Sequence, residues 1–213
     1  MLSRLQERIA RILADLPEAR EFALAGGAAL IAGGLVDRET RDLDFFADRL
    51  AAVSELLPVL EGALRQSGLQ VDRQKAHGGF ARLGVSDGTE STEVDLCYDV
   101  RVRPAETTSI GVVLAPEELA GDKMLAFLSR ALPRDLIDLH ALAQRFGFDR
   151  LCELAAEKDR GFNLAALADA LGSTQRLPEE AFEVADQSLV RELLAWAERQ
   201  RDRILASGPD HPA

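Results

Sequence analysis

Two aspartates, Asp42 and Asp44, flank a single leucine in the segment TRDLDFF, and this spacing could support chemistry. Side chains of a β-strand alternate between its faces, so residues two apart point the same way. Two carboxylates held together repel unless a cation lies between them, and hard divalent cations such as Mg²⁺ are the usual partners. The spacing therefore predicts a metal clamp. Taken alone, the pair also fits a solvated strand edge.

A second segment, TEVDLCYD, carries the same pattern. Glu93 and Asp95 share one strand face, and Asp95 stands between the apolar residues Val94 and Leu96. A charge in so apolar a segment is costly to bury without a partner, which indicates that Asp95 faces a site. A neighbouring strand could thus add a third carboxylate to the first pair.

A glycine pair, Gly26 and Gly27, separates the apolar run at residues 22–25 from the helix-forming segment AALIA. This pattern predicts a strand, a glycine turn and a helix whose N-terminus offers free N–H groups and partial positive charge to a phosphate. A glycine pair alone also fits a plain turn. Arg38 and Arg41 have two interpretations: they belong to a solvated loop and pair with nearby acids, or they contact a phosphate or an acceptor.

The elements that would position these residues change character along the chain. Apolar residues at spacings of three and four predict a first helix that ends before Pro17. Strand patterns then recur from Phe22 to Val113, interrupted by helical spacing after the glycine pair and over residues 50–67. Asp87-Gly88 is typical of a hairpin turn. We expect these strands to form one sheet.

Every segment after Pro116 has helical spacing. The predicted fold class is therefore α+β with α/β-like character: a mixed β-sheet with helices, followed by a helical bundle. We expect an α/β domain at residues 1–115 and a helical domain at residues 116–213.

Composition limits the function classes. The chain has 213 residues, 47% of them hydrophobic, and a net charge of -11, which argues against broad, nonspecific duplex binding. Cys97 and Cys152 lack a C-x-x-C spacing, so neither zinc nor a disulfide framework is expected. Neither a signal peptide nor an apolar run of membrane-spanning length is visible, so we expect a cytoplasmic protein without a membrane partner.

The stretches GGAALIAGGLVDRETRDLDFF, EVDL and DKMLAFLSRALPRDLIDLHAL together resemble the nucleotidyltransferase superfamily, specifically the AbiEii/AbiGii toxin family. The resemblance spans residues 22–145 and is most specific in D-L-D-F and R-D-L-I-D-L. It implies the nucleotidyltransferase fold and transfer of a nucleoside monophosphate from an NTP to a hydroxyl of RNA or protein. It also implies a toxin of a toxin–antitoxin system, with an antitoxin protein as partner.

The resemblance also implies roles for individual residues. The metal site would bind Mg²⁺, the glycine turn would hold the triphosphate with Arg41, and a downstream lysine would reach the phosphates. An aspartate of the R-D-x-x-D segment would complete the site; Asp135 and Asp138 both fit this position, and Asp138 is favoured. The implied catalytic residues are Asp42, Asp44, Asp95, Lys123 and Asp138; the implied metal ligands are Asp42, Asp44 and Asp95; and the implied nucleotide-binding residues are Gly26, Gly27, Arg41 and Lys123.

Two other functions fit the same residues. An antibiotic nucleotidyltransferase would modify a small molecule, and an acidic surface would suit a cationic drug. A catalytically silent member would keep the fold and bind only nucleotide or a protein partner. Gly27 stands where many superfamily members have serine, which allows this last interpretation.

Overall fold

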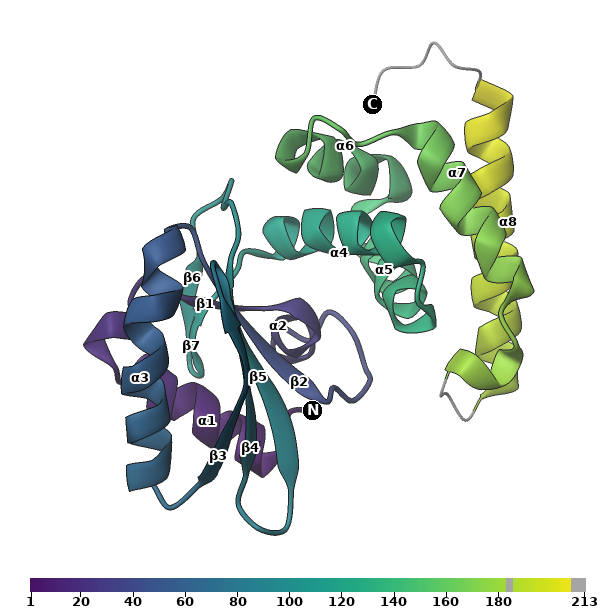
Figure 1. Cartoon of the computed structure of the whole chain (residues 1–213). Helices are drawn as coiled ribbons and strands as arrows, with labels where there is room; N and C mark the ends of the chain where they lie inside the picture. Colours follow the sequence, from purple (N-terminus) through teal and green to yellow (C-terminus); the bar gives the residue numbers. More distant parts are fainter. Residues whose placement is uncertain (183–185, 208–213) are drawn as a thin grey trace. The chain divides into compact units, whose positions relative to one another are not determined.

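A computed structural model describes residues 1–182 and 186–207 of the chain (Figure 1). The chain divides into two compact units, Met1–Leu119 and Ala120–Ala213. The division falls within the helix α4 (Pro116–Arg130). The two domains expected at residues 1–115 and 116–213 remain a prediction.

The first unit is built on one mixed sheet. Its strands are β1 (Ala23–Ala25), β2 (Asp42–Ala47), β3 (Gln70–His77), β4 (Phe80–Ser86), β5 (Ser91–Tyr98), β6 (Glu106–Thr108) and β7 (Gly111–Val113). Among the described residues, these seven strands lie in the order β3-β4-β5-β2-β1-β7-β6. β2 pairs antiparallel with β1 and parallel with β5. The predicted mixed sheet is confirmed, and the short hairpin β6–β7 is an addition to it.

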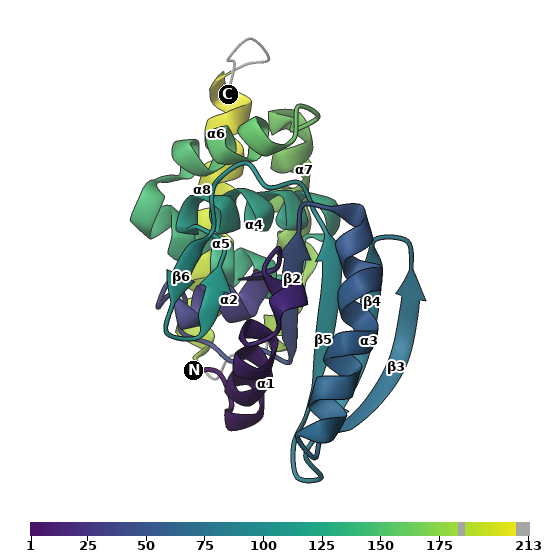
Figure 2. The ribbon, with the colours of Figure 1, turned by 90° about the vertical axis from the view of Figure 1, so that its left-hand side faces the viewer.

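Helices of the first unit lie on both faces of this sheet. They are α1 (Arg4–Ala14), the 3-10 turn η1 (Pro17–Ala19), α2 (Gly26–Ala32) and α3 (Leu50–Gln66). α1 and α3 pack on each other on one side of the strands, and α2 lies on the other side against β1 and β2 (Figures 1 and 2). Leu43 and Phe45 of β2 are buried, whereas Asp42 and Asp44 are half-buried on the opposite face. The sheet therefore keeps its acidic face partly open.

A buried glutamine ties α1 to the start of β2. The Ser3 side chain accepts from the Gln6 backbone N–H, and the Gln6 side chain accepts from the Ser3 N–H, which completes a capping box. Gln6 Nε2 also donates to the carbonyl of Thr40 at 3.0 Å and to Thr92 Oγ1 at 3.3 Å. The Thr92 hydroxyl donates to the carbonyl of Arg41 at 2.9 Å. These bonds fix the backbone immediately before the two aspartates.

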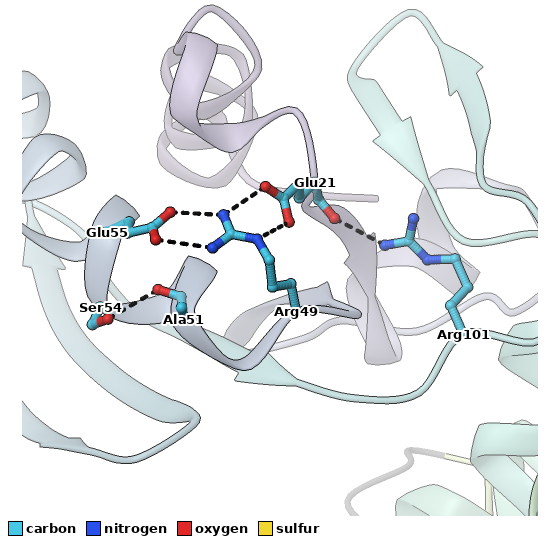
Figure 3. A network of polar contacts seen from close by, with 6 residues as sticks. All are labelled: Glu21, Arg49, Ala51, Ser54, Glu55 and Arg101. Carbon is cyan, nitrogen blue, oxygen red and sulfur yellow. Dashed lines mark hydrogen bonds and ion pairs between the residues drawn. The ribbon is translucent and has the colours of Figure 1, made fainter.

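An arginine network braces the other end of β2 (Figure 3). The Arg49 guanidinium donates to both carboxylate oxygens of Glu21, at 2.7 and 2.6 Å, and to both of Glu55, at 2.9 and 2.7 Å. These hydrogen bonds lower the pKa of both glutamates. Arg101 donates to the carbonyls of Glu21 and Phe46. The segment before β1, the end of β2 and the start of α3 are thereby linked.

The second unit is helical throughout its described residues, as the sequence predicts. It contains most of α4, then α5 (Pro133–Phe146), α6 (Phe148–Lys158), α7 (Leu164–Ser173), the 3-10 turns η2 (Thr174–Arg176) and η3 (Glu179–Phe182), and α8 (Gln187–Ser207). α7 and α8 lie side by side in both views (Figures 1 and 2). None of the helices across residues 1–182 and 186–207 is long and apolar enough to cross a membrane.

A histidine lies in the aromatic core of this unit. His140 on α5 is buried, and its ring lies edge-on to the indole of Trp196, with the ring centroids 5.3 Å apart. Phe148 packs against the same indole at 5.7 Å. Burial lowers the pKa of His140 below its ordinary value. The folded unit therefore favours the neutral imidazole.

Acidification is expected to destabilise the second unit through His140. Its pKa is lower in the folded than in the unfolded state, so the stabilisation is complete above the unfolded pKa of about 6.5 and is lost as the pH falls towards the folded pKa. Denaturant unfolding followed by the fluorescence of the single tryptophan, Trp196, between about pH 8 and pH 5 measures this effect. The variant His140→Gln should lose less stability over the same range. Equal losses in the two proteins would contradict the assignment.

Candidate active site

The register of two parallel strands collects the predicted carboxylates. β2 and β5 pair so that Asp42 lies beside Glu93 and Asp44 lies beside Asp95. Registered neighbours point to the same face of a sheet, so the four carboxylates share one face. The structure thus brings Asp95 to the Asp42–Asp44 pair from a strand that is distant in sequence.

The glycine turn lies directly against Asp44. Gly26 begins α2 with a φ of +60°, in the left-handed region that favours glycine. A Cβ added to Gly26 would overlap the Oδ2 atom of Asp44, far inside van der Waals contact. The Asp44 carboxylate therefore occupies the space that the missing side chain leaves. The glycine turn and the paired aspartates form one site rather than two.

Arg38 and Thr40 close the other side of the turn. A Cβ added to Gly27 would lie 2.7 Å from Arg38 Nη2 and 3.2 Å from Thr40 Oγ1. The Thr40 hydroxyl donates to Asp42 Oδ1 at 2.7 Å, so it orients that carboxylate. Arg38 brings its guanidinium to the glycine turn, whereas Arg41 is exposed. The assignment of Arg41 to nucleotide binding stays a prediction.

Arg82 on β4 is a member of this cluster that the sequence did not reveal. β4 pairs with β5 so that Arg82 lies beside Asp95. Its Nε and Nη2 atoms donate to the two oxygens of Asp95 at 2.7 and 2.6 Å, and Nη1 lies 3.1 Å from Glu93 Oε2. The hydrogen bonds to Asp95 raise the pKa of Arg82 above its ordinary value. The proximity of Arg82 to Asp95 can be recognised only from the strand register, because the sequence around Arg82 has the ordinary alternating pattern of a β-strand.

The donor set fits a hard divalent cation. Mg²⁺ prefers oxygen ligands and commonly takes one or two protein carboxylates, with water and substrate phosphates completing its shell. Asp42 and Asp44 supply two such carboxylates on one strand face. In the described part of the chain, no three His, Cys, Asp or Glu side chains form a ready metal cage, and the cation beside Asp95 is the Arg82 guanidinium. Asp42 and Asp44 therefore offer two oxygen donors of the type that Mg²⁺ prefers.

Cys97 lies on the same strand face, two residues after Asp95. Burial, reinforced by the charges of Asp44 and Asp95, raises the pKa of the Cys97 thiol to about 12. The thiol stays protonated at neutral pH and is a poor nucleophile there.

The remaining predicted residues form a buried ion-pair cluster within the second unit. Lys123 Nζ lies 2.9 Å from Asp138 Oδ2 and 3.7 Å from Asp135 Oδ1, and both aspartates are fully buried. Arg130 donates to both oxygens of Asp135 at 2.7 and 2.8 Å. Asp138 is thus the principal partner of Lys123, while Asp135 is shared with Arg130. The catalytic roles of Lys123 and Asp138 stay predictions.

Solved structures share this fold. JHP933 from Helicobacter pylori is 19% identical with a TM-score of 0.61, and the match covers 97% of this chain and 96% of that one. A putative nucleotidyltransferase from H. pylori is 21% identical with a TM-score of 0.59, covering 96% and 95%. MenT4, a nucleotidyltransferase toxin from Mycobacterium tuberculosis, is 20% identical with a TM-score of 0.60, covering 95% and 90%. The fold is that of the nucleotidyltransferases.

The sequence defines the group more closely. Residues 8–207 match the family described as nucleotidyl transferase AbiEii toxin, type IV toxin–antitoxin system. The chain belongs to this family and is a nucleotidyltransferase, which confirms the resemblance found in the sequence. A search of curated proteins gave no match.

Replacing Gly26 with alanine is expected to cost more stability than the same change at Gly34. Both residues have positive φ, +60° and +64°, so each alanine would add about 1–2 kcal/mol of backbone strain. Only Gly26→Ala also drives a methyl group into the Asp44 carboxylate, because nothing lies within 4 Å of a Cβ at Gly34. Urea unfolding of the two variants measures the difference. Equal losses would contradict the close approach of Asp44 to the glycine turn.

Proposed function

We propose that this chain is a metal-dependent nucleotidyltransferase that moves a nucleoside monophosphate from an NTP to a hydroxyl of RNA or protein, and that it acts as a toxin in the cytoplasm. The observation that supports this most is the close approach of the Asp44 carboxylate to Gly26, with Asp42 on the same strand face. Metal ligands and a phosphate-binding turn are the two parts that this reaction needs side by side.

In this proposal Asp42 and Asp44 hold Mg²⁺, and Asp95 completes the metal site. Gly26 and Gly27 are proposed to hold the triphosphate at the N-terminus of α2, next to Asp44 and Arg38. The cation would lower the pKa of the acceptor hydroxyl and neutralise charge on the departing pyrophosphate. The residues of the chain bind and orient the reactants.

The proposed transfer exchanges one bond at the α-phosphorus of the NTP for another. The acceptor oxygen forms a bond to the α-phosphorus of the NTP as the bond from that phosphorus to the bridging oxygen of pyrophosphate breaks. The hydroxyl proton is lost to solvent, and pyrophosphate leaves with the bonding electron pair. The product is the acceptor carrying a nucleoside monophosphate.

Cationic side chains complete the proposed site. Arg38, whose guanidinium lies against Gly27, is suited to contact a phosphate at the turn. Arg41 and Lys123 are proposed as further phosphate contacts, and Asp138 as the residue that orients the Lys123 ammonium through their 2.9 Å ion pair. Asp138 and the more distant Asp135, 3.7 Å away, hold the buried ammonium as a directed point charge.

Asp42→Asn and Asp44→Asn are each expected to lower transfer by about 10²–10³-fold, because each removes a charged metal ligand. The measurement incubates the protein with each of the four labelled NTPs, Mg²⁺ and total cellular RNA or protein, and quantifies label on the acceptor. Asp72→Asn, a change at an exposed aspartate of β3, is the matched control and should retain full transfer.

Three outcomes would contradict the proposal. Transfer that persists in EDTA or in the Asp44→Asn variant would rule out the metal role. Tight Mg²⁺-dependent NTP binding without transfer to either acceptor class would favour the catalytically silent interpretation. Transfer to an aminoglycoside alone would favour a small-molecule acceptor.

Toxicity is a separate expectation. Induced expression of the wild-type chain should arrest growth of the host, whereas the Asp44→Asn variant at equal abundance should not. Coexpression of the proposed antitoxin should restore growth. Arrest by both versions would show that toxicity does not depend on the aspartate site.

A further inference from the structure

Arg82 forms a close ion pair within the carboxylate cluster. Its guanidinium donates hydrogen bonds to both oxygens of Asp95, at 2.6 and 2.7 Å, and its Nη1 atom lies 3.1 Å from Glu93 Oε2. The Asp95 carboxylate is almost fully buried, whereas Arg82 is partly exposed. A buried carboxylate requires a cationic or hydrogen-bonding partner, and Arg82 supplies one to Asp95.

Arg82 is influenced by other carboxylates besides Asp95. Asp95 lies in register with Asp44, and Glu93 lies in register with Asp42. The charges of Asp95, Glu93 and Asp42 all favour the protonated guanidinium. One arginine therefore holds the position that a divalent cation would take if Asp95 were a metal ligand.

We propose that Arg82 is an exchangeable counter-ion, which orients the Asp95 carboxylate and competes with a divalent cation for it. This inference rests on the proposed metal site. Arg82 is thus a positioning residue that weakens cation binding before the nucleotide arrives. A cation that arrives bound to NTP phosphates has more oxygen ligands, so it competes better with Arg82 for the Asp95 carboxylate.

The surroundings of Arg82 fit such an exchange. Its Cζ atom lies 5.8 Å from the centroid of the Phe80 ring, which offers an attractive contact that does not involve Asp95. Its side chain is partly exposed, so the guanidinium has access to water when it leaves the carboxylate. A planar fork also suits phosphate, the group that arrives with the cation.

The test measures binding of Mn²⁺ to the nucleotide-free full-length chain by the electron paramagnetic resonance signal of the free ion. Arg82→Gln should bind Mn²⁺ about tenfold or more tightly than wild type, because it removes a competing positive charge beside Asp95. The double variant Arg82→Gln with Asp95→Asn should lose that gain. Arg82→Lys, which keeps the charge but loses the bidentate fork, should lie between wild type and Arg82→Gln.

The same unit contains a matched control pair. Arg73 donates to both oxygens of Glu61 at 2.6 and 2.9 Å, and Glu61 is buried to a similar degree as Asp95. Arg73→Gln breaks an ion pair of the same geometry outside the carboxylate cluster. It should leave Mn²⁺ affinity unchanged.

Thermal unfolding gives a second readout for variants with reduced stability. Mn²⁺ should raise the Tm of Arg82→Gln more than that of wild type, because the cation takes the place of the lost guanidinium. Equal or weaker Mn²⁺ binding by Arg82→Gln, together with an equal Tm shift, would overturn the inference. Failure of the proposed function would be seen in the transfer assay instead, as absent or metal-independent nucleotide transfer by the wild-type chain.

Discussion

Mutual repulsion of carboxylates on one sheet face is the constraint on which the site depends. Asp42, Asp44, Glu93 and Asp95 are brought together by the parallel register of β2 and β5. Such a cluster is unfavourable without compensation. The Thr40 hydroxyl donates to Asp42, and the Arg82 guanidinium donates to Asp95. Gly26 has no side chain and so leaves room for the Asp44 carboxylate. These contacts order the cluster and offset part of the repulsion between its carboxylates.

The scaffold holds both ends of β2, the strand that carries the two central aspartates. Gln6 on α1 bonds the backbone before the strand, and the Arg49 network links its far end to α3. Each exposed ion pair contributes little alone. Together, the Gln6 hydrogen bonds and the Arg49 network fix β2, which has a buried core face and a partly open acidic face.

Much of this organisation could be predicted from local sequence. Periodicity predicted the helices and the main strands, and the D-L-D spacing predicted two carboxylates on one face. Arg82 could not be found in this way, because its role arises from pairing between strands β4 and β5 and not from its neighbours in sequence. β6 and β7 have three residues each, too few to show a period. The close approach of Arg38 to Gly27 likewise depends on how a loop folds back.

The central claim is that Asp42 and Asp44 hold a divalent cation next to a nucleotide at the glycine turn. A crystal structure with Mn²⁺ and a non-hydrolysable NTP analogue, using anomalous scattering to locate manganese, tests it most directly. The account predicts an anomalous peak about 2.1 Å from oxygens of both aspartates and of the triphosphate, with phosphates against Gly26 and Gly27. Manganese or triphosphate bound away from these residues would contradict it.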